Sequence, residues 1–78
     1  MADIKTNKVP RFYFRWKMRA LAPHIRKEID STLFFLDKSE IDHFRYGHET
    51  GHRVYHIVLK DGTIYEWNTV RDYSSRNL

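Results

Sequence analysis

The sequence predicts an α+β fold in which one helix covers an antiparallel meander of three or four strands. Three observations lead to this prediction. Apolar residues in the stretch 23–36 recur at helical spacing, whereas those from Ile41 onward are rich in the branched and aromatic residues of strands. Asp61-Gly62 separates the last two of these runs, which is the strongest short-range signal for a hairpin. The expected order is β-α-β-β-β, with strands that follow one another in the chain lying side by side.

All 78 residues are expected to form one domain, with residues 1–8 flexible and residues 68–78 a polar tail. The chain contains twelve aromatic residues and no cysteine, so its stability would come from burying rings and not from disulfides. The first eight residues lack the apolar stretch of a signal peptide, and no apolar run approaches the roughly 18 residues that a membrane span needs. We therefore expect a cytoplasmic location and no membrane partner.

Residues 11–19 are compatible with two structures. As a strand, they place one set of side chains toward the core, namely Phe12, Phe14, Trp16 and Met18, and the cations with Tyr13 on the other face. As a helix, they align Phe14, Met18 and Leu21, with Pro10 at the first position. The strand is preferred for residues 11–17 because closely spaced aromatic residues suit a pleated surface.

The next segment is expected to be a helix that begins at Pro23, a residue well suited to the first helical position. Its apolar positions form one face, consisting of Ile25, Ile29, Leu33 and Leu36. Arg26 and Lys27 fall on the exposed side, while Phe34 and Phe35 either widen the apolar face or mark the end of the helix.

The remaining chain is expected to form three strands. They cover residues 41–46, 54–59 and 64–67, joined by a turn at residues 47–51 and by the hairpin at Asp61-Gly62. A two-residue type I′ turn is expected at Asp61-Gly62.

The stretch from His48 to His52 matches the H-E-x-x-H pattern and in that respect resembles the zincin metalloproteases. On a helix the pattern would direct two imidazoles at one zinc ion and leave Glu49 as general base. Gly47, Thr50 and Gly51 are poor helix formers, however, so a hairpin turn is the preferred interpretation. A weaker possibility places His52 and His56 on one strand face with His43 as a third ligand, but half-exposed histidines without metal are the preferred reading.

Other catalytic patterns are missing from the sequence. The serines do not lie in a Gly-x-Ser-x-Gly elbow, and the three glycines fall in turns and not in a phosphate loop. We therefore expect no enzyme, no cofactor and no metal site.

The distribution of charge is uneven. The first 27 residues contain eight Lys or Arg and one acid, whereas the other 51 contain six Lys or Arg and nine acids. A basic segment that also carries aromatic residues suits the backbone and bases of DNA or RNA, so nucleic acid is the favoured partner. The candidate binding residues are Lys8, Arg11, Tyr13, Arg15, Lys17, Arg19 and Arg26.

Two alternatives to nucleic-acid binding remain open. The cations could protect an edge strand from aggregation without binding any ligand. The chain could instead be a small inhibitor or interaction module that docks on a larger protein through Tyr55, Tyr65 and Trp67, since Tyr and Trp dominate interface hot spots.

Overall fold

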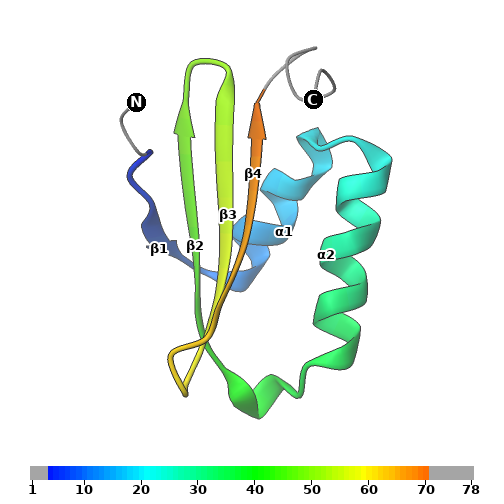
Figure 1. Cartoon of the computed structure of the whole chain (residues 1–78), viewed down its shortest axis with the longest axis vertical. Coiled ribbons are helices and arrows are strands. Elements are labelled where there is room, and N and C mark those ends of the chain that lie inside the picture. The colour runs from blue at the N-terminus through cyan, green and yellow to red at the C-terminus, as the bar shows by residue number, and fades with distance from the viewer. Residues whose placement is uncertain (1–3, 71–78) are drawn as a thin grey trace.

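The computed structural model describes residues 4–70 and shows a four-stranded sheet with its helices on one side (Figure 1). In chain order the elements are β1 (Asn7–Val9), α1 (Arg11–Lys17), the 3-10 helix η1 (Met18–Ala20), α2 (Pro23–Phe35), the 3-10 helix η2 (Lys38–Glu40), β2 (Ile41–Glu49), β3 (His52–Leu59) and β4 (Ile64–Val70). All pairings are antiparallel and the strand order is β1-β2-β3-β4. The predicted α+β fold with an antiparallel meander is therefore confirmed.

The core lies between the helices and one face of the sheet. Its fully buried side chains are Phe14 from α1, Ile29 from α2, and Tyr55 and Ile57 from β3. Burial of each such side chain contributes roughly 1.5–3 kcal/mol. Because Phe14 packs against Phe44 of β2, with the rings tilted and their centroids 4.8 Å apart, α1 is fixed over the centre of the sheet.

Residues 11–17 form a helix, so the prediction of a strand there is wrong. Pro10 caps the helix, and its carbonyl oxygen accepts hydrogen bonds from the backbone N–H groups of Tyr13 and Phe14. Phe14 and Met18 lie one turn apart and are both buried. Phe12 and Trp16, which the strand interpretation placed in the core, are 74% and 58% exposed.

The edge of the sheet next to β2 is formed by β1, which the sequence did not predict. Asn7 and Lys8 belong to this strand, opposite Tyr46 and Arg45 of β2, although residues 1–8 were expected to be flexible. Likewise, residues 68–70 belong to β4, where they pair with β3, and not to a polar tail. The rest of these two expectations concerns residues 1–3 and 71–78, which lie outside the described residues, together with residues 4–6, of which Thr6 is hydrogen-bonded to Arg45.

The prediction for α2 is confirmed. Pro23 is its first residue, Ile29 is fully buried, and the other apolar positions of the stripe are partly buried against the core. Phe34 and Phe35 are 85% and 83% exposed, so they mark the end of the helix and do not widen its buried face. No helix within residues 4–70 is both long enough and apolar enough to cross a membrane.

Both predicted hairpins are present, with differences in detail. The first is tighter than predicted, because β2 continues to Glu49 and only Thr50 and Gly51 form the turn. In the second, the N–H of Gly62 donates to the carbonyl oxygen of Leu59 over 3.0 Å, which makes a three-residue loop and not the predicted two-residue type I′ turn. Gly62 has a φ of 95°, a conformation that favours glycine.

Candidate functional site

The outer face of α1 carries exposed rings and cations together. Residues three and four positions apart share one face of a helix, and here this face consists of Phe12, Arg15, Trp16 and Arg19, the last on η1. These four residues are called the α1 surface below. All four side chains are exposed, so the two rings and the two guanidinium groups are available to a partner.

Few acids compensate the cations of the α1 surface. Arg15 forms an ion pair with Asp30 of α2 over 3.6 Å, but both side chains are half exposed, so the pair contributes little and is readily exchanged. Arg19 forms no ion pair with any acid in residues 4–70. The positive charge of this surface is therefore largely uncompensated within the part of the chain that the structure describes.

Lys17 connects the α1 surface to a group of tyrosines. Its Nζ atom lies 5.3 Å from the ring centroid of Trp16, 5.4 Å from that of Tyr13 and 5.5 Å from that of Tyr46. Such distances allow cation–π attraction to each ring. Tyr13 lies 6.2 Å from Tyr46, which is buried, and 6.3 Å from Trp16, which is exposed, measured between ring centroids, so the three rings form one cluster.

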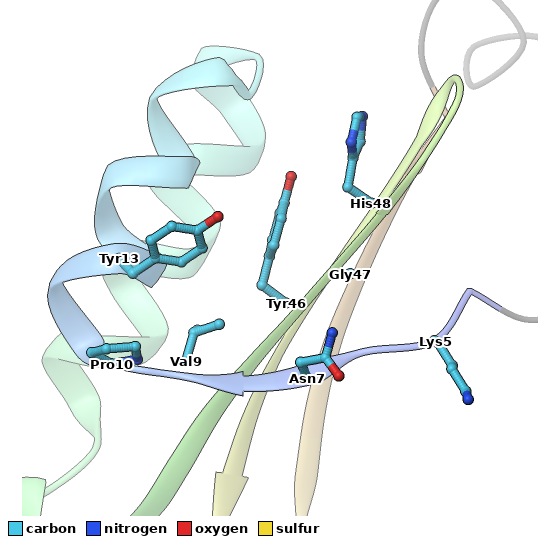
Figure 2. Close-up of a pocket in the computed structure, with 8 residues that line it drawn as sticks. All are labelled: Lys5, Asn7, Val9, Pro10, Tyr13, Tyr46, Gly47 and His48. Atoms are coloured by element: carbon cyan, nitrogen blue, oxygen red, sulfur yellow. The ribbon is translucent and has the colours of Figure 1, made fainter.

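A groove of about 560 Å³ lies beside these tyrosines, between α1 and the edge formed by β1 and β2 (Figure 2). It is lined by Lys5, Asn7, Val9, Pro10, Tyr13, Tyr46, Gly47 and His48, and is called the tyrosine groove below. Figure 2 shows Tyr13 directed toward Tyr46, with Asn7 and His48 on the same side of the sheet and Lys5 pointing away. None of the eight lining residues is acidic.

The N-terminal wall of the groove is held against β2 by two features. Arg45 donates from Nε to Thr6 Oγ1 over 3.0 Å and from Nη2 to the Thr6 carbonyl oxygen over 2.7 Å. Gly47 allows the chain to pass closely, because a Cβ atom at this position would clash with the carbonyl oxygen of Lys5. Both features fix the position of Asn7 relative to Tyr46.

The structure brings together only part of the predicted nucleic-acid-binding set. Arg15, Lys17 and Arg19 lie on or beside the α1 surface, and Tyr13 is half-buried in the tyrosine groove. Lys8 alternates with Asn7 and Val9 along β1, so it lies on the opposite face of the sheet.

The other two predicted cations are half-buried. Arg11 lies over the ring of Phe44, with its Cζ atom 5.7 Å from the ring centroid, and Arg26 lies in the first turn of α2. Sequence reasoning missed the exposed rings of Phe12 and Trp16, which the helical spacing of residues 11–19 could have revealed. It also missed Asn7, Tyr46 and His48, which only the strand register brings to the groove.

The predicted protein-docking residues are only partly accessible. Tyr55 is fully buried, so the prediction that it belongs to an exposed docking patch is wrong. Tyr65 is 37% exposed and stacks on Trp67, with ring centroids 6.3 Å apart. The Nε1–H of Trp67 donates to Glu28 Oε1 over 3.1 Å, which ties this ring to α2.

The H-E-x-x-H residues lie in a hairpin, as the preferred interpretation predicted. His48 and Glu49 end β2 and His52 begins β3, opposite Glu49, so the two histidines do not share a helical face. Within residues 4–70 there is no group of three or more His, Cys, Asp or Glu side chains arranged to hold a metal ion.

The other two histidines of the weaker metal hypothesis each face a carboxylate. His43 Nδ1 lies 2.7 Å from Asp42 Oδ2, and His56 Nε2 lies 3.8 Å from Glu66 Oε1. Burial lowers the pKa of His56, and the nearby Glu66 carboxylate opposes that shift.

Comparison of the chain with protein-family models, with curated proteins and with solved structures finds no match.

Proposed function

We propose that the protein binds single-stranded nucleic acid through the α1 surface, with Lys17 beside it. The observation that carries this proposal is the exposure of Phe12 and Trp16 among cations that acids in residues 4–70 hardly compensate. Cations that follow a phosphate backbone and flat rings that stack on bases are the two parts of a single-strand binding surface. A single strand is favoured over a duplex because the bases must be unstacked to reach the rings.

The proposed role is binding without catalysis. The residues of the α1 surface can neutralise phosphates and stack on bases, but they include no pair of groups that could act as general acid and base. A cytoplasmic location is part of the proposal, since nucleic acid is found there and a chain without cysteine needs no oxidising compartment.

The proposal predicts a measurable dependence on salt. If Arg15, Lys17 and Arg19 each neutralise one phosphate, the slope of log affinity against log salt is about −2 for a single strand. Affinity would then decrease roughly 20-fold between about 50 and 200 mM salt.

Fluorescence anisotropy with a labelled single-stranded oligonucleotide tests this prediction. Arg15→Gln with Arg19→Gln removes two of the three contacts and is expected to reduce the slope to about −0.7. The matched control is Lys38→Gln with Lys60→Gln. This double variant removes the same charge from two exposed positions, one shortly before the start of β2 and one directly after the end of β3. Equal effects of the two double variants would show that only net charge matters and would contradict a site on α1.

A second candidate, docking on a larger protein, is favoured by a separate observation. Phe34 and Phe35, at the end of α2, are both more than 80% exposed, and Ile64 on β4 is 56% exposed. Phenylalanine is enriched in protein interfaces relative to the rest of the surface. Phe34→Ser with Phe35→Ser would then abolish capture of the partner in the presence of nuclease and leave oligonucleotide binding unchanged. Loss of oligonucleotide binding in this variant would contradict the assignment of nucleic acid to α1.

A further inference from the structure

We propose that the tyrosine groove receives one nucleobase of the bound strand, with the base on Tyr13, which the buried Tyr46 supports, and its polar edge toward Asn7 and His48. This inference rests on the proposed function and identifies a second part of the same binding surface. Three properties of the groove support it: its size and shape, its polar groups and its charge.

The size and the ring geometry of the groove suit a flat ligand. Its volume of about 560 Å³ lies within the range of roughly 300–1,000 Å³ that is usual for small-molecule sites. The rings of Tyr13 and Tyr46 are inclined at 75° with centroids 6.2 Å apart. Tyr13 is half-buried, whereas Tyr46 is only 8% exposed and packs against Tyr13 and Tyr55. A planar base can therefore stack on Tyr13, while Tyr46 supports that ring edge-to-face from the core.

The polar groups of the groove match the hydrogen-bonding edge of a base. The Asn7 side chain offers an amide that both donates and accepts, and His48 offers ring nitrogens. Asn7 is opposite Tyr46 in the β1–β2 register, and His48 is two residues beyond Tyr46 on the same strand. The three side chains therefore share one face of the sheet, as Figure 2 shows.

The charge around the groove favours an anionic ligand. None of its lining residues is acidic, and the Lys17 ammonium lies about 5.5 Å from the centroids of both tyrosine rings. The same ammonium lies 5.3 Å from the centroid of Trp16. Lys17 can therefore bind the phosphate between a base in the groove and the next base on Trp16, so the groove and the α1 surface form one path.

Two oligonucleotides of equal length test the inference: an oligothymidylate and an abasic oligonucleotide with the same number of phosphates. Tyr13→Leu and Asn7→Ala are each expected to weaken binding of the oligothymidylate about 5-fold or more and to leave binding of the abasic strand unchanged. Asn68→Ala is the matched control, because Asn68 is an exposed asparagine on β4, the strand farthest from β1 in the sheet. Asn7 is itself exposed, so Asn7→Ala tests the groove even if Tyr13→Leu impairs folding.

Backbone NMR shifts on titration with thymidine monophosphate, and separately with inorganic phosphate, locate the contact. The inference is supported if the nucleotide shifts Asn7, Tyr46 and His48 and inorganic phosphate does not. It is overturned if both variants bind the oligothymidylate as the parent does; the proposed function then stands as long as the Arg15→Gln, Arg19→Gln variant still reduces the salt slope. If the nucleotide binds in the groove but neither strand binds the protein, the groove is a free-nucleotide site, and both proposals are overturned as stated.

Discussion

The hydroxyl group of Tyr55 provides a sharp test of how α1 is fixed to the sheet. The residue is fully buried in β3, between the rings of Phe14 and Tyr46. Its hydroxyl donates to the carbonyl oxygen of Lys17 over 2.9 Å, at the last residue of α1. Burial raises the pKa of Tyr55, so the hydroxyl keeps its proton and remains a donor throughout the neutral range. Tyr55→Phe removes this donor and keeps the ring contacts.

The expected loss of stability follows from the geometry. The variant loses one hydrogen bond and leaves the carbonyl oxygen of Lys17 without its donor, which costs about 1–2 kcal/mol of unfolding free energy. For a domain of this size, each kcal/mol corresponds to roughly 4–8 °C in the melting temperature. The melting temperature is therefore expected to decrease by about 4–15 °C.

Thermal melts followed by circular dichroism, together with urea titrations, measure this change. Tyr65→Phe is the matched control, because Tyr65 is partly exposed and its hydroxyl has no hydrogen-bond partner in residues 4–70. This control is expected to unfold at the parent temperature. A Tyr55→Phe protein as stable as the control would refute the reasoning, since the hydroxyl would then contribute nothing to the attachment of α1.

Three further predictions concern stability. Gly47→Ala introduces a Cβ that clashes with the carbonyl oxygen of Lys5, so we expect a loss of about 1–3 kcal/mol in urea titrations and faster amide exchange in β1; unchanged exchange would contradict the close approach. Ile29→Ala removes a fully buried side chain and is expected to cost about 2–5 kcal/mol, measured in the same way; a loss below this range would argue against its central place in the core. Burial holds the pKa of His56 below its ordinary value of 6.5, so between these two pKa values the unfolded chain binds more protons than the folded chain. Its contribution to stability is complete above pH 6.5 and decreases as the pH falls below 6.5, so urea midpoints from about pH 7.5 to pH 5 should vary less in His56→Asn than in the parent.

The sequence was sufficient for the elements in which several signals agree. In α2, the proline at the start and the apolar stripe through Ile29 favour the same helix. In β3 and β4, branched and aromatic residues on both sides of Asp61-Gly62 favour a hairpin. The loop type differs from the prediction in the position of Gly62. A type I′ turn would place Gly62 third among the four turn residues, whereas the hydrogen bond from Gly62 to Leu59 makes Gly62, with its positive φ, the fourth.

Residues 11–17 were predicted wrongly because the pattern fits both periods. Alternate positions place Phe12, Phe14 and Trp16 together, while helical spacing groups Phe14 with Met18. The strand was preferred because closely spaced rings suit a pleated surface, and this interpretation placed Phe12 and Trp16 in the core. Buried positions are usually apolar, but apolar residues are not always buried, and Phe12 and Trp16 are the exceptions here.

The tyrosine groove could not be predicted from local patterns. Tyr13 and Tyr46 come from different elements, and Asn7 reaches them only because the three-residue strand β1 pairs with β2 in the observed register. The two polar residues Asn7 and Lys8 carry no strand signal of their own. Long-range contacts fix this edge, in particular the bonds from Arg45 to Thr6 and the close approach at Gly47.

The helical form of residues 11–17 also changes the physical basis of the proposed function. A strand would have buried Phe12 and Trp16 and left the cations as a plain charged edge, for which protection against aggregation is a sufficient explanation. In the helix, both rings are exposed one turn apart, and each forgoes much of the roughly 1.5–3 kcal/mol that burial of a large apolar side chain contributes. A small domain has little stability to spare. The two exposed rings beside Arg15 and Arg19 are the reason why we propose a partner that covers them, and an anionic single strand whose bases stack on these rings would fit both the rings and the charge.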